Sequence, residues 1–555
     1  MNEVSLAEIF PHPATIPEQH RWPGPIEQRC CLCAGELRPW SGPVRDVWSP
    51  IHLSGSSLAA AAGAAAKLYP APAPAPAPAP AAAGELQPLR LGSYPLMGEK
   101  EAQAALAAAC QAYGQGLGEW PALGVAGRIA RVEQLVERMG AARSLVVRGL
   151  MWEIGKSYAE AEMEFARTLE YIGATIAELR RREQRQAAVV SEHGFLALFR
   201  RAPLGVALCL GPYNNPFYET FTILVPALLM GNTVIFKPPR LGVLLHSPLL
   251  EAFAEIFPPG VINTLYGEGE EILAPLMKSG RIDILAFIGS RRVADLLRQW
   301  HPQPRRLRCL LGLEAKNAAI VLADADLDRT VAECALGALA FNGQRCTALK
   351  MVFVHETLRA PFLEKLAELV DRLPAGMPWT PGVRITPLPE PARVAYLNGL
   401  LSDALAKGAR IINEGGGRVN QTFMTPTVLY PMDQSMRLYH EEQFGPLIPV
   451  AGFRDAAQPL GYVEQSEFGQ QVSIFGQDER EIIALSRPLL NQVARININC
   501  KCQRGPDSFP FTARKNSAEG TMAVAATLDA FSLSSLVAGK ADAGTRRVLA
   551  GLFPA

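Results

Sequence analysis

From residue 205 onward, short apolar runs alternate with longer segments of helical periodicity, and this alternation limits the fold more than any other feature of the chain. Residues 205–210 (GVALCL), 232–236 and 282–287 are predicted strands, and residues 244–257 form the predicted helix between the second strand and the third. Parallel strands joined by helices form a sheet covered on both faces, with the ligand cleft at the carboxyl ends of the strands. The pattern predicts an α/β protein.

A second alternation begins near Leu313. It contains a predicted strand at residues 318–322 and a predicted helix through Ala340, and Cys346 follows that helix. Upstream, apolar residues recur at helical spacing over residues 99–185, which predicts several amphipathic helices. Because 555 residues can bury a large core, we expect two or more lobes with a cleft between them.

Composition excludes several classes of protein. The 54 Lys and Arg residues nearly balance 53 Asp and Glu residues, so no whole-molecule field favours a nucleic acid. The sequence contains no apolar run of membrane-spanning length and no secretory signal, which predicts a cytoplasmic protein without a membrane partner. Ten cysteines are too dilute for a disulfide framework, and the pair Cys30 and Cys33 lacks the further ligands that zinc requires. We predict no metal.

Cys346 is the candidate nucleophile. Arg345 precedes it directly, and a nearby cation lowers the pKa of a thiol and so increases the thiolate fraction. The alternative interpretation is a buried cysteine that acts only as a small apolar residue. Other motifs in the chain decide between the two.

Several motifs resemble those of the aldehyde dehydrogenase superfamily, over about residues 90–535. Asn342, Gly343, Gln344 and Cys346 are similar to its active-site cysteine motif. The other matches follow in the superfamily's order: Pro212-Tyr213-Asn214-Asn215-Pro216 resembles the oxyanion asparagine segment, Phe236-Lys237-Pro238-Pro239 the adenosine-ribose lysine segment, Phe287-Ile288-Gly289-Ser290 the pyrophosphate turn, and Glu442-Gln443-Phe444-Gly445-Pro446 the nicotinamide-ribose glutamate motif.

The resemblance implies a dinucleotide site. Lys237 would reach the adenosine ribose, and Arg240 stands where NAD-preferring relatives commonly have a glutamate, so NADP is predicted, with NAD as the alternative. Gly289 and Ser290 would place a capping serine and free helix N–H groups beside the pyrophosphate. Glu442, in the motif that also contains Phe444, would accept hydrogen bonds from the nicotinamide ribose.

In the chemistry that the resemblance implies, the Cys346 thiolate attacks an aldehyde while the Asn214 amide and the Cys346 N–H stabilise the oxyanion. Hydride transfer to the nicotinamide then leaves a thioester. Gly312 occupies the position of the glutamate that activates water in hydrolytic members, and a glycine accepts no proton. Glu314, two residues along, is the candidate substitute base. Its direction stays open, because a two-residue shift in irregular backbone does not fix where the side chain points.

Three arginines indicate an anionic substrate. Within the superfamily, the chain is most similar to non-phosphorylating, NADP-dependent glyceraldehyde-3-phosphate dehydrogenases, in which arginines corresponding to Arg167, Arg345 and Arg504 would grip a phosphate. The tyrosine that this group has after the oxyanion asparagine is Asn215 here. The prediction is NADP-dependent oxidation of glyceraldehyde 3-phosphate, or of a similar small anionic aldehyde, to its acid.

Two rival functions follow from the missing glutamate. A dehydrogenase that transfers the acyl group of an acidic semialdehyde to coenzyme A needs no activated water. A non-catalytic homologue would keep cofactor affinity and act as a binding or assembly protein. Steady-state NADPH formation with and without coenzyme A separates the three possibilities.

The predicted fold is aldehyde dehydrogenase-like, with a Rossmann-type cofactor domain (87–185 and 203–311) and an α/β catalytic domain (312–490). Residues 186–202 and 491–555 are the predicted oligomerisation and bridging region, in which a small β extension at 186–202 is expected to pair with C-terminal strand residues such as 496–499. The open edges of this extension predict a dimer or tetramer. The Ala/Pro-rich residues 54–86 are predicted to be a polyproline-like insertion that separates the N-terminal segment 1–53 from the main body.

Overall fold

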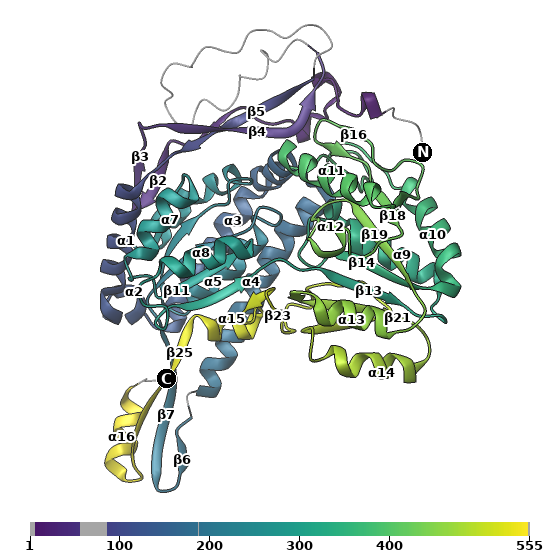
Figure 1. The fold of residues 1–555 in the computed structure, drawn as a ribbon. Helices are drawn as coiled ribbons and strands as arrows, with labels where there is room; N and C mark the ends of the chain where they lie inside the picture. Colours follow the sequence, from purple (N-terminus) through teal and green to yellow (C-terminus); the bar gives the residue numbers. More distant parts are fainter. Residues whose placement is uncertain (1–5, 56–85, 187, 553–555) are drawn as a thin grey trace.

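The computed structural model describes residues 6–55, 86–186 and 188–552. Two α/β lobes lie side by side (Figure 1), with the long strands β4 (Val44–Leu53) and β5 (Gln87–Pro95) across both at one end. A narrow arm built from β6, β7, β25 and α16 projects from the opposite end. The prediction that residues 54–86 form a polyproline-like spacer falls almost entirely outside the described residues.

The first lobe contains a six-stranded sheet in the order β10-β9-β8-β11-β12-β24. Its first five strands are parallel and β24 is antiparallel to β12. Parallel strands leave their carboxyl ends at one edge, so the loops after β8, β9, β11 and β12 meet there. The strands are β8 (Val206–Leu210), β9 (Thr233–Lys237), β10 (Ile262–Thr264), β11 (Ile284–Ile288), β12 (Arg308–Gly312) and β24 (Ala518–Glu519).

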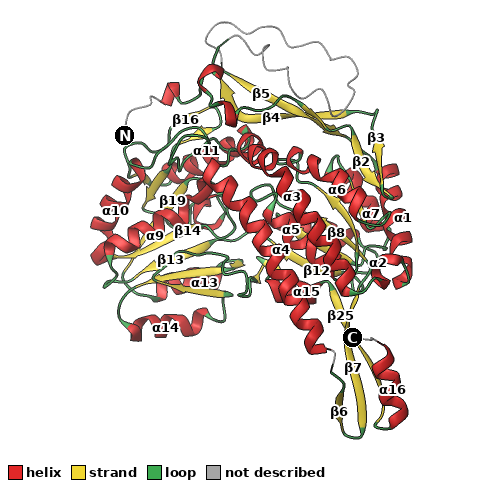
Figure 2. Ribbon diagram, turned by 180° about the vertical axis from the view of Figure 1, so that it is seen from behind, coloured by secondary structure: helices red, strands yellow, loops and turns green. Residues whose placement is uncertain are grey.

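Helices cover both faces of this sheet (Figure 2), as expected for strands that are buried along their whole length. All residues of α5 are buried, because it packs between the sheet and the long helices α3 and α4. The helices of this lobe are α1 (Glu99–Tyr113), α2 (Glu119–Ala122), α3 (Val125–Ile154), α4 (Tyr158–Gln186), α5 (Tyr218–Leu229), α6 (Leu250–Ile256), α7 (Gly269–Lys278), α8 (Arg291–Trp300) and α15 (Val524–Ala530).

The second lobe contains a seven-stranded sheet in the order β15-β18-β19-β14-β13-β21-β22, parallel except for β15. The strands are β13 (Asn317–Val321), β14 (Leu349–His355), β15 (Arg410–Ile411), β18 (Thr427–Tyr430), β19 (Leu447–Phe453), β21 (Gln471–Phe475) and β22 (Arg495–Ile498). The helices are α9 (Leu327–Leu339), α10 (Glu356–Asp371), α11 (Pro391–Ala406), α12 (Arg437–His440), α13 (Ala457–Gln465) and α14 (Glu479–Leu489).

The N-terminal segment is part of the main body, and the prediction that the insertion separates it was wrong. β4 pairs antiparallel with β5 across the insertion, and β1 (Ile26–Glu27) pairs with the other edge of β5. The hairpin β2 (Cys30–Cys33) and β3 (Glu36–Pro39) is anchored to β10, where Thr264 accepts a hydrogen bond from the Leu32 N–H at 2.8 Å. Because the strand before the insertion pairs with the strand after it, the N-terminal segment stays attached to the main body.

The projecting arm also differs from the prediction. β7 (Phe195–Pro203) pairs with β25 (Ser532–Lys540) on one edge and β6 (Val190–Glu192) on the other, whereas residues 496–499, the expected partner, lie in or next to β22 of the second lobe. β22 is the edge strand of the seven-stranded sheet and pairs in parallel with β21. β25 is exposed along nearly all its length. α16 (Ala543–Leu552) covers one face, where Leu549 packs on Leu196 and Leu198.

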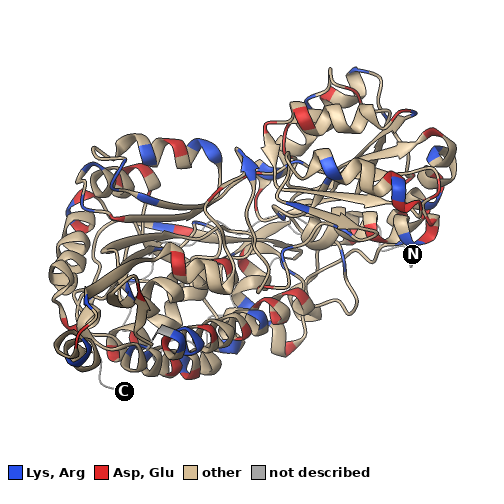
Figure 3. Ribbon diagram, turned by 90° about the horizontal axis from the view of Figure 1, so that it is seen from below, with Lys and Arg blue, Asp and Glu red and all other residues tan. Residues whose placement is uncertain are grey.

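Acidic and basic side chains are mixed over the surface helices (Figure 3), in keeping with the near-zero net charge. Among the described residues, no helix is long and apolar enough to cross a membrane. No group of three or more His, Cys, Asp or Glu side chains in the described ranges is arranged to hold a metal ion. Cys30, Cys31 and Cys33 are buried free thiols, and burial raises the pKa of Cys31 to about 12.

Candidate active site

Cys346 lies in the loop between α9 and β14, at the junction of the two lobes. The backbone turns sharply there, with Phe341 and Asn342 in left-handed conformations at φ 48° and 53°. Asn342 stabilises this strained turn, because its side-chain amide donates to the Thr386 carbonyl at 2.9 Å and accepts from the Thr386 N–H at 3.1 Å. Gly343 also has φ +73°, and a Cβ atom there would lie 2.6 Å from the Gly445 carbonyl oxygen. The motif residues therefore shape the loop that presents the thiol.

Asn214 reaches this loop from the first lobe, in the segment after β8. Its Nδ2 donates to the Gln344 carbonyl at 2.8 Å, and its side chain is buried. A carboxamide has two N–H donors, so this bond leaves one for a substrate oxygen. The structure brings Asn214 to the loop that contains Cys346, although the two residues are 132 positions apart in the chain.

A buried ion pair holds the Asn214 segment in place. Lys156 and Glu164 have side chains only 4% and 3% exposed, and they form a salt bridge. The Lys156 ammonium also donates to the Asn214 carbonyl and to the Asn215 Oδ1, both at 2.9 Å. Glu164 accepts hydrogen bonds from the Phe217 and Tyr218 N–H groups, each at 3.0 Å. The sequence analysis did not predict this ion pair.

The thiol is less acidic than its neighbour Arg345 suggested. Burial raises the pKa of Cys346, the Glu219 carboxylate raises it further, and Lys350 and Arg504 lower it. The guanidinium of Arg345 does not offset burial, and it donates to the Thr347 hydroxyl at 3.0 Å. The expectation of a thiolate favoured by the adjacent arginine is therefore wrong for the protein without ligands.

The peptide after Cys346 is fixed from the second lobe. Its carbonyl accepts from Asn317 Nδ2 at 2.8 Å and from Lys350 Nζ at 2.7 Å. Lys350 in turn pairs with Glu442 Oε1 at 3.0 Å, and the same oxygen accepts from the Ala315 N–H at 3.1 Å. Glu442 is therefore connected to the Cys346 loop through Lys350.

Glu314, and not the predicted Ser290, caps α8. Ser290 stands at the N-cap position but its side chain makes no capping hydrogen bond. Glu314 Oε2 instead accepts from the Arg291 N–H at 2.9 Å, and burial raises the pKa of this carboxyl. The structure thus directs Glu314 to the helix terminus at which the sequence predicted a pyrophosphate.

The space beside Gly312 is filled by the Met522 side chain. A Cβ atom at Gly312 would lie 3.1 Å from the Met522 Cε, so a larger side chain there would displace that methionine. Gly312 lies in β12, where its carbonyl accepts from the Gly289 N–H at 2.9 Å. No carboxylate occupies this position, as the sequence indicated.

The other residues that the sequence predicted for the cofactor, Lys237 and Arg240, lie at the carboxyl edge of the first sheet. Lys237 ends β9, burial lowers its pKa to about 8, and the charges of Glu268, Arg240 and Arg45 also act on it. Arg240 is exposed and pairs with Glu390 of the second lobe at 2.6 Å. Arg45, from β4, pairs with Glu268. The sequence did not predict Arg45, because it belongs to the segment that was expected to lie apart.

Phe444, in the loop before β19, adopts a left-handed conformation at φ 46°. Its ring lies edge-on to Tyr213, with 5.9 Å between the ring centres. Phe444 therefore lies beside the segment that contains Asn214.

Two of the three predicted substrate arginines are neutralised by carboxylates. Arg167 pairs with Asp507 at 2.7 Å, and Arg504 pairs with Glu219. The Tyr218 ring lies between them, 4.4 Å from the Arg167 Cζ and 4.9 Å from the Arg504 Cζ, and its hydroxyl donates to Asp507 at 2.7 Å. Glu219 was not predicted, although its sequence carries a signal, because it is the only charged residue of a buried helix.

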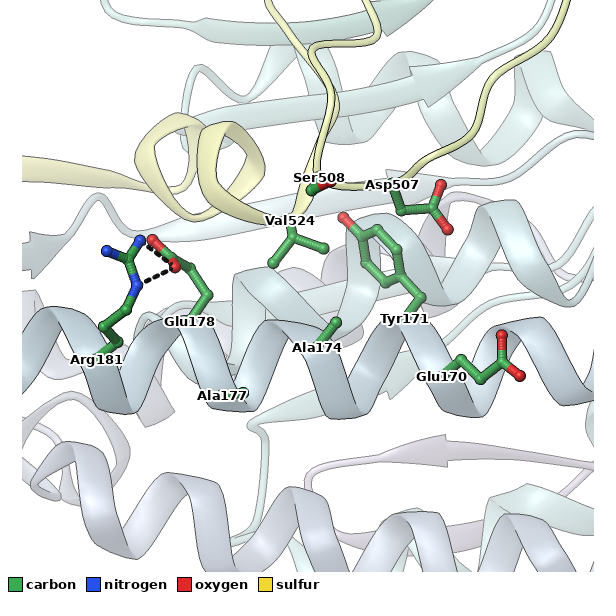
Figure 4. Close-up of a pocket in the computed structure, with 9 residues that line it drawn as sticks. All are labelled: Glu170, Tyr171, Ala174, Ala177, Glu178, Arg181, Asp507, Ser508 and Val524. Carbon is green, nitrogen blue, oxygen red and sulfur yellow. Dashed lines mark hydrogen bonds and ion pairs between the residues drawn. The ribbon is translucent and has the colours of Figure 1, made fainter.

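A hollow of about 520 Å³ opens on the outer side of this cluster (Figure 4). α4 lies along one side of it, and the segment around Asp507 and Ser508 lies along the other. Neither Cys346 nor Asn214 lines it, so it is separate from the thiol.

A parallel sheet covered on both faces by helices, whose carboxyl edge faces a second α/β lobe, is typical of dinucleotide-dependent enzymes. The model of the aldehyde dehydrogenase family matches residues 87–537. The chain belongs to the aldehyde dehydrogenase family.

Individual relatives agree with this assignment. An NADP-dependent glyceraldehyde-3-phosphate dehydrogenase of Streptococcus equinus is 32% identical over 448 residues, which cover 79% of this chain and 91% of the relative. A salicylaldehyde dehydrogenase of Pseudomonas sp. (strain C18) is 30% identical over 341 residues, covering 60% and 70%. The crystal structure of NADP-dependent glyceraldehyde-3-phosphate dehydrogenase from Bacillus halodurans C-125 complexed with NADP has a TM-score of 0.80 and 27% identity, covering 93% and 100%.

Proposed function

We propose that this protein oxidises a small anionic aldehyde, of which glyceraldehyde 3-phosphate is one candidate, to its acid with NADP as the oxidant. The observation that carries the proposal is the contact between Asn214 and the Cys346 loop, where Nδ2 lies 2.8 Å from the Gln344 carbonyl oxygen. That contact brings an amide donor to the loop that contains Cys346, which supports a role for Asn214 in oxyanion stabilisation. The relatives from Streptococcus equinus and Bacillus halodurans C-125 are both named NADP-dependent glyceraldehyde-3-phosphate dehydrogenase, which supports the choice of substrate and cofactor.

The carboxyl edge of the first sheet fits a dinucleotide. Lys237, Arg240 and Arg45 supply positive charge for the adenosine end, and Arg240 is the residue we assign to the 2′-phosphate. The contacts of Glu442 with Lys350 and Ala315 both involve Oε1. The other carboxylate oxygen, Oε2, is therefore suited to accept hydrogen bonds from ribose hydroxyls. When bound, the nicotinamide accepts hydride.

In the proposed reaction the Cys346 sulfur bonds to the carbonyl carbon, and the carbonyl oxygen takes the negative charge. Asn214 Nδ2 and the Cys346 N–H donate to that oxygen. Loss of hydride from the same carbon leaves a thioester on Cys346. Water then adds to the thioester, the C–S bond breaks, and the acid and the free thiol are released.

The base for that last step is the open part of the mechanism. Gly312 cannot accept a proton, and the Glu314 carboxylate is bonded to the Arg291 N–H. Glu314 would have to leave the α8 terminus to activate water. This arrangement favours, as the second candidate function, transfer of the acyl group to coenzyme A, whose thiol needs no activated water.

NADPH formation from glyceraldehyde 3-phosphate with and without coenzyme A tests the proposal. We expect steady turnover without coenzyme A, with the free acid as product. A single burst that becomes steady only after coenzyme A is added would establish the acylating alternative. Cofactor binding without any burst would indicate a non-catalytic homologue. Absorbance at 340 nm and mass spectrometry of the product separate these outcomes.

Glu314 should also control the affinity for NADP. A carboxylate at the α8 terminus competes with the pyrophosphate for the same N–H group, so we expect Glu314→Gln to lower the Kd for NADP by about fivefold at pH 8. Protonation of Glu314 removes the repulsion, so wild-type affinity should fall as pH rises through the pKa of this carboxyl, which burial raises. Calorimetric titration at several pH values measures both effects. Equal Kd values and parallel pH profiles in the two proteins would refute the competition.

We also propose that the arm mediates self-association. Apolar side chains are exposed along both of its paired long strands: Phe195, Phe199, Leu533, Leu536 and Val537. Exposed apolar strands of this kind are normally covered by a second subunit.

A further inference from the structure

The first turn of α4 and the two residues before it (156–160) contact both segments of the candidate active site. Lys156 Nζ donates to the Asn214 carbonyl at 2.9 Å. The same ammonium lies 4.5 Å from the centre of the Phe341 ring, in the loop that leads to Cys346. One short stretch of the first lobe therefore touches the Asn214 segment and the thiol loop of the second lobe.

Glu160 makes a direct hydrogen bond to the thiol loop. Its Oε1 accepts from the Phe341 N–H at 2.9 Å, although the two residues are 181 positions apart. Its Oε2 accepts from the Ser157 hydroxyl at 2.9 Å. Phe341 has φ 48°, a conformation that is strained for a residue with a side chain and persists only where the surroundings hold it. Glu160 is one of the groups that hold the start of the turn before Cys346.

The helix start alone does not account for the position of this carboxylate. Ser157 and Glu160 have the spacing of a capping box, and the Ser157 hydroxyl accepts from the Glu160 N–H at 3.3 Å. In a capping box the glutamate accepts from the backbone N–H of the capping residue. Here one carboxylate oxygen is bonded to the Ser157 hydroxyl and the other to Phe341 in the second lobe. The side chain thus connects α4 to the thiol loop.

We propose that Glu160 is a positioning residue that holds the Cys346 loop in register with the Asn214 amide. The inference rests on the proposed function and deepens the account of its site. The turn is bound to the first lobe at both ends, by Glu160 at Phe341 and by Asn214 at the Gln344 carbonyl, 2.8 Å from Nδ2. Loss of the first bond lets the turn shift, and a shift of about 1 Å in a reacting group can lower a rate by about 10²-fold.

Two substitutions at Glu160 test this role by NADPH formation from glyceraldehyde 3-phosphate. Glu160→Ala should lower kcat by about 10- to 100-fold and leave the Kd for NADP within about twofold. Glu160→Gln should keep kcat within about threefold, because its Oε1 still accepts from Phe341 and its Nε2 can donate to the Ser157 hydroxyl. Burial lowers the pKa of Arg345 and the Glu160 charge opposes this, so the Gln variant separates the hydrogen bond from the charge.

Asp478→Ala is the matched control. Asp478 accepts from the Arg480 N–H at 2.8 Å at the start of α14, so this variant also removes a carboxylate that binds a backbone N–H. It should leave kcat within about twofold, as expected for an exposed site away from the thiol.

A double-mutant cycle identifies what the loop is positioned against. Asn214→Ala should lower kcat by about 10²–10³-fold on its own. Adding Glu160→Ala should then lower it by at most about twofold more, because the amide that the loop must face is gone. Equal effects of Glu160→Ala with and without Asn214, an unchanged kcat in Glu160→Ala, or a Gln variant as impaired as the Ala variant would each overturn the inference.

Hydrogen exchange of residues 341–346, followed by mass spectrometry, needs no turnover. Exchange should be about tenfold faster in Glu160→Ala and unchanged in Glu160→Gln and Asp478→Ala, because only the first variant frees the Phe341 N–H. Unchanged exchange in Glu160→Ala would overturn the inference. If exchange changes as expected but the wild-type protein forms no NADPH from any aldehyde, the hold of Glu160 on the loop stands and the proposed function fails.

Discussion

Cys346→Ala should abolish aldehyde oxidation, with a fall in kcat of about 10⁴-fold or more, because no thioester can form without the sulfur. The loop itself should persist, since Asn342, Gly343 and the Asn214 contact with Gln344 do not involve the thiol. NADP affinity should therefore stay close to the wild-type value. The rate is measured as NADPH formation, and the affinity by calorimetric titration.

Cys500→Ala is the matched control. Cys500 is a partly exposed free thiol in the same lobe, and its removal should leave turnover within about twofold. The covalent route through Cys346 would be untenable if Cys346→Ala kept more than about a tenth of the activity, or if the control lost as much as the variant.

Lys156→Met should lower the free energy of unfolding by about 3–5 kcal/mol, because it strands the Glu164 charge in a site that is 3% exposed. The urea midpoint of the first lobe should fall accordingly. Activity should fall as well, by up to about 10²–10³-fold, since the Lys156 ammonium donates to Asn214 and Asn215 and so positions the oxyanion amide.

A double variant separates the two effects. Lys156→Met combined with Glu164→Gln removes the stranded charge, and should recover much of the stability without recovering the activity. Arg138→Met breaks the exposed pair with Glu255 and should cost at most about 1 kcal/mol. Equal losses of stability in Lys156→Met and Arg138→Met would show that burial of the Lys156–Glu164 pair has no energetic consequence.

Much of the fold could be predicted because its signals are local. The predicted strands at 205–210, 232–236, 282–287 and 318–322 correspond to β8, β9, β11 and β13, since an apolar run between helices is typical of a buried parallel strand. β10 was missed, because its three residues are too few to show a period. The prediction of which strand pairs with β7 was wrong, because the pairing of distant strands is not encoded in either strand alone.

Some candidate site residues were also brought together as expected. Asn214 contacts the Cys346 loop, and Lys237 and Gly289 lie at the carboxyl edge of the first sheet. The environments of these residues were not predictable to the same degree. The raised pKa of Cys346 comes from burial and from Glu219, and the neutralisation of Arg504 comes from a carboxylate 285 positions away.

The sequence by itself determined the alternation of strands and helices, the candidate nucleophile and the missing carboxylate at Gly312, because each depends on adjacent residues or on a short motif. Only the tertiary structure decided that Glu314 caps α8, that Arg45 of β4 pairs with Glu268 of the first lobe, and that Glu219 pairs with Arg504. The charge and solvation of a side chain depend on which groups lie next to it, and these neighbours are brought together by the packing of segments that are far apart along the chain.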